Sequence, residues 1–240
     1  MTDGDDGEVT DLPDAPPLEE PVHVSDDPGR PDNVILGAPG AMLVIISGPS
    51  GVGKDTIIDE LHRRERASGR AGERHYVVTV TTRSPRDGEV DGVDYHFVDR
   101  QEFLRIRAER GFLEANEVHG NWYGSPRQQV RDALSRGRDV ILKIDVQGAQ
   151  VVKEQVSEAV LIFIVPPSLE TLISRLRARA TETADELEVR QRDAAVEIAR
   201  QGDYDHVVVN ETGDVGGTAD QIEAIIASER ASHVGRRVRI

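Results

Sequence analysis

A glycine-rich turn at residues 48–54 limits what this chain can fold into more than any other feature of its sequence. It reads Gly-Pro-Ser-Gly-Val-Gly-Lys and lies between an apolar run, Met42–Ser47, and a stretch of helical periodicity that opens near Thr56. Glycines let the backbone curl until successive N–H groups face one point, and the helix that follows adds the partial positive charge of its N-terminus. Lys54 supplies a mobile ammonium group. The sequence therefore predicts a phosphate-binding loop between a buried strand and a helix.

The residue after this lysine departs from the usual form of such a loop. Ser or Thr is expected there, because its hydroxyl group coordinates Mg²⁺, whereas this chain has Asp55 and only then Thr56. A carboxylate is a good ligand for a hard cation, but it also places negative charge beside the phosphates. Thr56 is a weaker candidate, because successive side chains on a helix point about 100° apart. Phosphate binding is thus predicted, and the metal geometry is left open.

Composition excludes several classes of protein. The 240 residues suffice for one α/β domain with lobes or for two small domains, and 38% of them are hydrophobic, which is enough for a core. The absence of cysteine excludes disulfides, thiolate catalysis and cysteine-ligated metals. No apolar run approaches the roughly 18 residues of a membrane span, and no signal peptide opens the chain. We therefore expect a soluble, cytoplasmic protein without a membrane partner.

The first 41 residues differ in composition from the rest. They contain eleven acidic residues, one base (Arg30) and seven prolines, and so carry 10 of the 15 net negative charges. This composition, with almost no aliphatic periodicity, predicts a disordered acidic tail, which either solvates the protein or binds a basic partner. A domain is expected over residues 42–235, followed by a short basic tail at 236–240. Because the domain is also acidic, we expect no nucleic-acid partner.

From Met42 onward, patterns typical of strands alternate with patterns typical of helices. Strands separated by helices predict a parallel sheet that helices cover on both faces. Residues 82–124 break this alternation and are expected to form a small inserted lobe, and residues 175–192 suggest an exposed, mobile flap. The runs with strand length and β-branched content are Met42–Ser47, Tyr76–Thr81, Val140–Asp145, Leu161–Val165 and His206–Val209.

Capping residues predict where the helices begin and end. Asp99 precedes a helical stretch that ends at Gly111. The sequence Ser125-Pro-Arg-Gln128 is typical of a capping box with proline at the first helical position, and Gly137 is expected to close that helix. Three further helices are expected to open at Ser168, Thr183 and Thr218.

An acidic residue stands at the carboxyl end of the predicted strand Val140–Asp145. Ligands of open α/β sheets bind at that edge, so Asp145 is a candidate to hold Mg²⁺ through water. The same carboxylate is also a candidate cap for the helix near Gln147. The two roles are compatible.

Polar residues of the inserted segment suit a purine nucleotide. Arg83 and Arg86 stand three apart in a proline-containing loop and can converge on one phosphate, to which Tyr95 and Tyr123 can donate hydroxyl groups. Taken singly, two loop arginines are commonly solvated and a tyrosine is commonly half-buried core. Glu114 lies beside apolar residues, where a carboxylate can accept N1–H and N2–H from guanine, a pairing that adenine does not offer.

These motifs together resemble the guanylate kinase family, in order and in spacing. The resemblance extends from about Met42 to Glu229, and its middle blocks are more specific than the phosphate loop. It implies a three-layer α/β P-loop NTPase fold with a central parallel sheet: a core at 42–81, 125–167 and 205–235, an inserted GMP-binding lobe at 82–124 and a small helical lid at 168–204. The blocks that carry it are Gly48–Lys54, Thr81–Glu89, Asp94–Val98, Phe112–Glu114, Gly120–Ser125 and Ile144–Gly148.

The resemblance also implies an activity, the transfer of the γ-phosphoryl group of ATP to GMP (and to dGMP), with Mg²⁺ as cofactor. The implied catalytic residues are Lys54, Arg83, Arg175, Arg179 and Arg190. ATP would be held by Gly48, Pro49, Ser50, Gly51, Val52, Gly53, Lys54, Asp55, Thr56 and Asn210. GMP would be held by Thr79, Arg83, Arg86, Glu89, Tyr95, Glu114, Tyr123 and Ser125. The metal would lie near Asp55 and Asp145.

Two residues near the phosphates depart from the family's pattern. Asp55 replaces the hydroxyl residue, and Lys143 stands where the family usually has an acid. An acid gained and an acid exchanged for a base suggest a compensating pair. We therefore predict that their charged atoms lie within salt-bridge distance, inside about 4–6 Å.

Two other functions are open to a chain with these residues. The Lys54–Asp55 form of the loop also resembles ribose 1,5-bisphosphate phosphokinases, although these have no reason to keep Glu114 or the arginine loop at 83–89. A non-enzymatic guanylate-kinase-like module would bind partner peptides with the GMP lobe, but such modules typically have a degraded phosphate loop. The sequence leaves the oligomeric state undecided between a monomer and a homo-oligomer.

Overall fold

The computed structural model describes residues 38–178, 184–232, 234–235 and 237–240, without the side chains of Ala178 and residues 184–189. Most of the predicted acidic tail (residues 1–37) and the predicted helix start at Thr183 lie outside the described residues. Residues 38–40 form a turn, and Ala41 is buried in the core, so the prediction of a disordered tail is wrong for the last of its residues.

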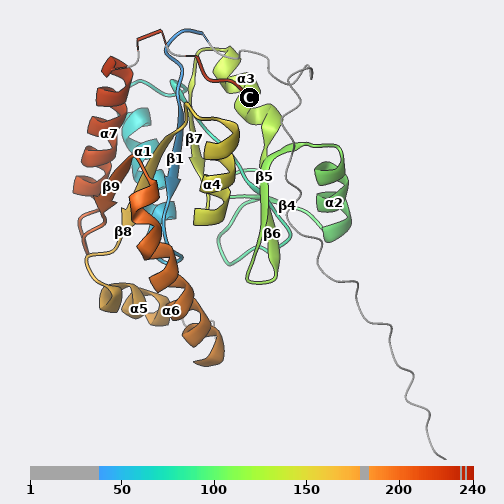
Figure 1. Cartoon of the computed structure of the whole chain (residues 1–240), viewed down its shortest axis with the longest axis vertical. Coiled ribbons are helices and arrows are strands. Elements are labelled where there is room, and N and C mark those ends of the chain that lie inside the picture. Colours follow the sequence, from blue (N-terminus) through green and yellow to red (C-terminus); the bar gives the residue numbers. More distant parts are fainter. Residues whose placement is uncertain (1–37, 179–183, 233, 236) are drawn as a thin grey trace, which may run out of the picture. The chain divides into compact units, whose positions relative to one another are not determined.

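A five-stranded parallel sheet forms the core of the domain (Figure 1), as the sequence predicts. Its spatial order is β2-β7-β1-β8-β9. All five residues of β1 are buried, because apolar side chains on both of its faces are covered by helices. The strands are β1 (Leu43–Ser47), β2 (Arg74–Tyr76), β7 (Asp139–Lys143), β8 (Val160–Val165) and β9 (His206–Val209).

Helices pack on the two faces of this sheet. On one face, Ile57 and Leu61 of α1 join Ile222 and Ile226 of α7 against alternate residues of β1. On the other face, α3 and α4 contribute residues such as Leu134 and Val152 to a second cluster. The helices are α1 (Lys54–Ala67), α3 (Arg127–Ser135), α4 (Val146–Gln155) and α7 (Val215–Ser232).

A four-stranded mixed sheet with one helix, α2 (Arg100–Ala108), forms the inserted lobe. Its small core is aromatic: the rings of Phe103 and Phe112 stack with centroids 4.6 Å apart, and Trp122 packs beside them. The strands, in spatial order, are β4 (His96–Phe97), β3 (Val80–Thr81), β6 (Asn121–Pro126) and β5 (Phe112–Val118).

The predicted strand Tyr76–Thr81 is wrong, because the chain passes from one sheet to the other within it. β2 ends at Tyr76 in the parallel sheet, and β3 begins at Val80 in the lobe. Between them, the side chain of Gln129 accepts a hydrogen bond from Val78 N (3.1 Å) and donates one to Val78 O (3.3 Å). The side chain of Gln129 thus satisfies the backbone groups of Val78 that a neighbouring strand would otherwise satisfy. The hydrophobic periodicity of the sequence does not reveal this contact.

The predicted caps of α2 and of α5 (Leu169–Ala178) are confirmed. Asp99 accepts a hydrogen bond from Glu102 N (2.8 Å), and Ser168 Oγ accepts one from Thr171 N (3.1 Å). Gly137 follows α3 with a φ of 75°, which fits its predicted role at the end of that helix.

Two other predicted helix starts are wrong. Ser125 is not a cap, because it belongs to β6 and α3 begins at Arg127. Thr218 lies inside α7, before which Asp214 accepts a hydrogen bond from Gly217 N at 2.8 Å.

The remaining described elements are α6 (Ala184–Ala199) and a short 3₁₀ helix, η1 (Arg200–Asp203). The predicted basic tail does not extend freely, since Val238 and Ile240 are buried in the core. Among the described residues, no helix is long and apolar enough to cross a membrane.

Candidate active site

The phosphate loop lies at the carboxyl end of β1, where backbone geometry demands glycine. Gly48, Gly51 and Gly53 have positive φ angles of 145°, 82° and 103°. A Cβ atom on Gly48 would stand only 2.3 Å from Ile164 O in β8. The loop therefore packs directly on the neighbouring strand, and α1 begins with Lys54 at its end.

The ammonium of Lys54 folds back over this loop. Its Nζ donates to Gly48 O (2.6 Å) and to Pro49 O (3.1 Å). Burial lowers the pKa of Lys54, and three nearby carboxylates oppose that shift: Glu197, Asp55 and Asp145. The ammonium of Lys54 thus lies at the loop with three carboxylates near it.

Sequence reasoning missed Glu197, which lies in α6. Ser50 N, in the phosphate loop, donates to Glu197 Oε2 at 3.4 Å, across 147 positions of the chain. Among the charges near Lys54, Glu197 opposes the lowering of the lysine pKa most strongly. No local motif marks this residue, so only the packing of α6 reveals it.

The predicted pairing of Asp55 with Lys143 is confirmed. Lys143 Nζ lies 2.5 Å from Asp55 Oδ1, well inside the predicted limit. The same ammonium lies 4.8 Å from the ring centroid of Tyr95 in the lobe. Lys143 therefore contacts both the helix that follows the phosphate loop and the lobe.

Asp145 caps a helix, which is one of the two roles expected of it. It is the N-cap of α4, and its Oδ1 accepts a hydrogen bond from Gly148 N at 2.8 Å. No cluster of three or more His, Asp or Glu residues in the described parts of the chain can hold a metal by itself. Mg²⁺ is usually held by one or two carboxylates together with water and substrate phosphates. Asp55 and Asp145, both near Lys54, fit such a ligand set.

Three of the residues expected to hold the acceptor phosphate, Arg83, Tyr95 and Tyr123, lie together in the lobe. The Arg83 guanidinium carbon lies 5.3 Å from the ring centroid of Tyr95, whose ring is 6.1 Å from that of Tyr123. Glu89 supports this group rather than facing it: its carboxylate accepts hydrogen bonds from Arg83 (2.8 Å) and from Arg86 N (2.7 Å). The loop therefore presents Arg83 in a fixed orientation.

A buried polar cluster lies where the lobe meets α4. Glu114 is buried, and its carboxyl group accepts hydrogen bonds from Ser125 Oγ (2.5 Å) and from the Asn116 amide (2.9 Å). Burial raises the pKa of Glu114 to about 8, against the opposing hydrogen bond from Ser125. The hydroxyl of Thr79 is also buried and has no hydrogen-bond partner in the described structure, which points to a ligand that would supply one. Sequence reasoning missed Asn116.

The three arginines expected in the lid differ in what the structure shows of them. Arg175 donates to Val52 O (3.2 Å) and to Asn210 O (3.1 Å), so it is held against the phosphate loop. Arg190 lies in α6, the helix that carries Glu197. Arg179 lies outside the described residues.

Comparison with known proteins identifies the family. A sequence model of a protein family, described as guanylate kinase, matches residues 40–229. The chain belongs to the guanylate kinase family. The predicted family and the predicted α/β fold with a central parallel sheet are thereby confirmed.

Individual guanylate kinases are similar over most of the chain. Guanylate kinase 2, chloroplastic/mitochondrial, of Oryza sativa subsp. japonica is 44% identical over 84% of this chain and 69% of its own length. The guanylate kinase of Carboxydothermus hydrogenoformans is 42% identical over 79% of this chain and 89% of its own length. The crystal structure of guanylate kinase from Anaplasma phagocytophilum matches with a TM-score of 0.64 and 37% identity, and covers 81% of this chain and 88% of that one.

In this member of the guanylate kinase family, the side chain of Asn210 stabilises the phosphate loop. Its side-chain amide is buried, donates to Val52 O (2.7 Å) and accepts from Thr218 Oγ1 (3.1 Å). A Cβ atom on Gly53 would stand 2.6 Å from Asn210 Nδ2, so the two segments are in close contact. This contact gives Asn210 a structural role in addition to the expected one.

Replacing Asn210 with alanine is expected to destabilise the domain by about 1–3 kcal/mol, because its buried hydrogen bonds with Val52 O and with Thr218 Oγ1 are lost. Urea unfolding measures this change, and titration with ATP should show weaker binding. The control is Asn121→Ala, since the hydrogen bond that this amide donates to His119 O is exposed to solvent and its loss should cost less than about 0.5 kcal/mol. Equal stability of the two variants would contradict this stabilising role.

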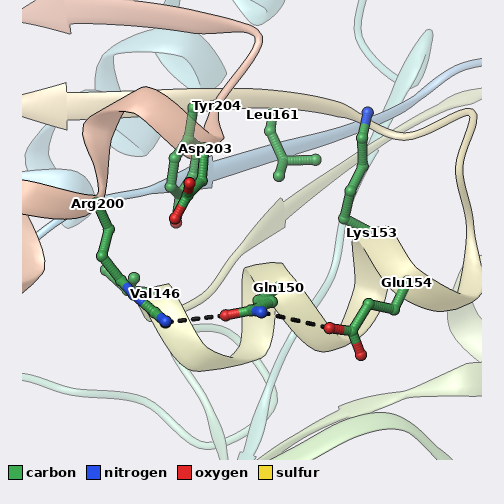
Figure 2. A pocket seen from close by; sticks show the side chains of 8 residues that line it. All are labelled: Val146, Gln150, Lys153, Glu154, Leu161, Arg200, Asp203 and Tyr204. Carbon is green, nitrogen blue, oxygen red and sulfur yellow. Dashed lines mark hydrogen bonds between the residues drawn. The ribbon is translucent and has the colours of Figure 1, made fainter.

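A separate pocket of about 330 Å³ lies beside α4 and η1, and contains none of the residues expected to bind substrate. Figure 2 shows Gln150 on its rim, between Arg200 and Glu154, to which it is hydrogen-bonded. One of its lining residues, Tyr204, reaches the nucleotide side: its hydroxyl donates to Ser47 Oγ at 3.1 Å. Sequence reasoning did not foresee this link between η1 and the end of β1.

Proposed function

We propose that the chain is an ATP:GMP phosphotransferase, which forms ADP and GDP from ATP and GMP and also accepts dGMP. The observation that carries this proposal is the buried cluster around Glu114. A carboxyl group held by two fixed donors matches the edge of guanine that presents N1–H and N2–H, and the buried Thr79 hydroxyl lacks a partner that a ligand would supply. The phosphate loop supplies the site for the second nucleotide.

Charge neutralisation and positioning account for the catalysis in this proposal. Two polyanions must meet in line, so the protein's part is to hold them and to offset their charge. Lys54 and the N–H groups of the loop bind the ATP phosphates, and Arg83 with Tyr95 and Tyr123 orients the acceptor phosphate. Asp55 and Asp145 would hold Mg²⁺, which when bound neutralises charge on the phosphoryl oxygens.

The lid arginines and lobe closure complete the proposed mechanism. Arg175 is already held against the phosphate loop, and Arg179 and Arg190 are proposed to approach the transferred group with it. Closure of the lobe over GMP would exclude water, which otherwise competes as the acceptor and wastes ATP. Ribose 1,5-bisphosphate has no base that would present the two neighbouring N–H donors proposed to bond to Glu114. A peptide-binding module needs no phosphate loop. Each alternative therefore leaves part of this site without a function.

A coupled assay of ADP formation tests this proposal, with ATP and Mg²⁺ and with GMP, AMP or ribose 1,5-bisphosphate as the acceptor. We expect turnover with GMP and not with the other two. Turnover with the sugar phosphate alone would assign the chain to the rival group of kinases. Measurable GMP binding without any turnover would instead support a non-catalytic module.

A further inference from the structure

Lys143 is held where the phosphate loop and the lobe meet. It ends β7, and its Cα is paired with that of Ile46 in β1, two residues before Gly48. The register of the sheet therefore fixes its backbone beside the start of the loop. Its side chain is mostly buried, with 19% exposure, so the ammonium is also held in place.

Lys143 is a charged neighbour of the phosphate loop. Its ammonium donates a hydrogen bond to Asp55, in the helix that follows the loop. Its charge also acts on Lys54. Lys143 is therefore a second ammonium group near the phosphate loop, paired with an acid that most such loops do not have.

The ring of Tyr95 connects Lys143 to the expected acceptor-phosphate site. The Arg83 guanidinium lies 5.3 Å from the centroid of this ring, and the Lys143 ammonium lies 4.8 Å from it. A phosphate that accepts hydrogen bonds from Arg83 and from the Tyr95 hydroxyl would thus lie beside Lys143. An ammonium carries three N–H donors, so a hydrogen bond to Asp55 does not prevent donation to a phosphate oxygen.

We propose that Lys143 binds the phosphate of GMP directly and that Asp55 is the residue that positions it. This inference rests on the proposed function and adds to it a binding residue that the resemblance to the family does not assign. In the transfer, an oxygen of the GMP phosphate bonds to the γ-phosphorus of ATP. The bond from that phosphorus to the bridging oxygen breaks, and its electron pair leaves with ADP. Lys143 offsets the repulsion between the two phosphates as they approach.

A simpler explanation has to be separated from this one, namely that Lys143 only neutralises Asp55. Calorimetry of GMP binding and of guanosine binding separates the two explanations. It is carried out on Lys143→Met, on Asp55→Ser and on the double variant. If Lys143 contacts the phosphate, both variants that lack it should bind GMP at least about 10-fold more weakly, as expected for a lost hydrogen bond to a charged group. Guanosine, which has no phosphate, should bind to all of them alike.

The double variant decides between the two explanations. If Lys143 only neutralised Asp55, removing both would restore GMP binding to that of the unmodified protein, and this result would overturn the proposal. Lys143→Arg, which keeps the charge, should retain most of the preference for GMP over guanosine. In turnover, Lys143→Met should raise KM for GMP and change KM for ATP by less than about 3-fold.

A second lysine–aspartate pair serves as the matched control. Lys153 Nζ lies 3.1 Å from Asp205 Oδ2, and neither residue belongs to the expected substrate sites. The double variant Lys153→Met with Asp205→Ser should leave the GMP preference unchanged, and an equal loss there would also overturn the proposal. Turnover by the unmodified protein tests the proposed function separately. The comparison of GMP binding among the variants tests the role of Lys143, and its meaning does not depend on whether GMP is phosphorylated.

Discussion

Replacing Lys54 with methionine is expected to reduce kcat for phosphoryl transfer by about 10³-fold or more, while GMP still binds. Lys54 is the ammonium of the phosphate loop, and positioning and electrostatic stabilisation supply most of the catalysis in this type of reaction. Methionine keeps much of the side-chain volume but removes the charge. Steady-state turnover with saturating ATP and GMP measures the effect, and calorimetry with GMP provides the control.

The fold should tolerate this change at Lys54. Burial lowers the pKa of Lys54, which means that the folded protein holds this ammonium at a cost in free energy. The variant should therefore unfold at a temperature no lower than that of the unmodified protein. A variant that melts well below it would show that the hydrogen bonds to Gly48 O and Pro49 O are needed for folding, and the loss of activity would then have another cause.

Replacing Glu114 with glutamine is expected to weaken GMP binding by a factor on the order of 10²–10³, since a site built to bond polar groups loses much affinity when one bond cannot form. The amide would place N–H donors against the N–H donors of guanine. Calorimetry measures the loss. The control is Glu117→Gln, three residues along the same strand and not part of the buried cluster. A loss of less than about 3-fold at position 114 would contradict guanine recognition by this carboxyl group.

The raised pKa of Glu114 also predicts a dependence on pH. At pH 7 the carboxyl group is mostly protonated in the free protein, because burial raises its pKa to about 8 in the fold from an ordinary value of 4.5. Guanine donors favour the ionised form, so GMP binding should release close to one proton at pH 7. Its affinity should rise as pH increases towards 8 and then level off. Calorimetry in two buffers of different ionisation enthalpy measures the proton, and Glu114→Gln should release none.

The same shift has a consequence for stability, with the sign opposite to that of an ordinary carboxyl group. The folded state holds the proton more tightly than the unfolded state does, so stability falls as pH rises from about 4.5 to about 8 and is constant above that. Glu114→Gln cannot ionise and escapes this loss. It should therefore be more stable than the unmodified protein at pH 8, by on the order of 2–4 kcal/mol.

Local motifs explain why much of the fold and site could be predicted. The phosphate loop, the segment around Asp145 and the arginine loop are each one continuous stretch of sequence. The spacing of the residues within each stretch therefore predicts how these residues are arranged in the structure. The Asp55–Lys143 pair spans 88 positions and was still predicted, because two unusual charges occurred together near one site.

Other contacts depend on packing alone. Glu197 reaches the phosphate loop, and Tyr204 reaches Ser47 at the end of β1, only because α6 and η1 pack there. Ser125 shows how one local preference loses to a distant partner: the sequence favours a helix cap, but the hydroxyl bonds to Glu114 across the β5–β6 pair. A local preference for capping a helix takes no account of a partner on another strand.

Gly148 shows where base preference can be altered in this protein. Its N–H bonds to Asp145, and a Cβ atom there would stand 2.9 Å from Glu114 Oε2 and 3.2 Å from Asn116 Nδ2. A side chain at position 148 would therefore disturb both Asp145 and Glu114, the residues proposed to act on the metal and on the guanine. A redesign for another nucleobase has to proceed from the strands of the lobe, where β5 and β6 carry Asn116 and Ser125, and leave the helix as it is.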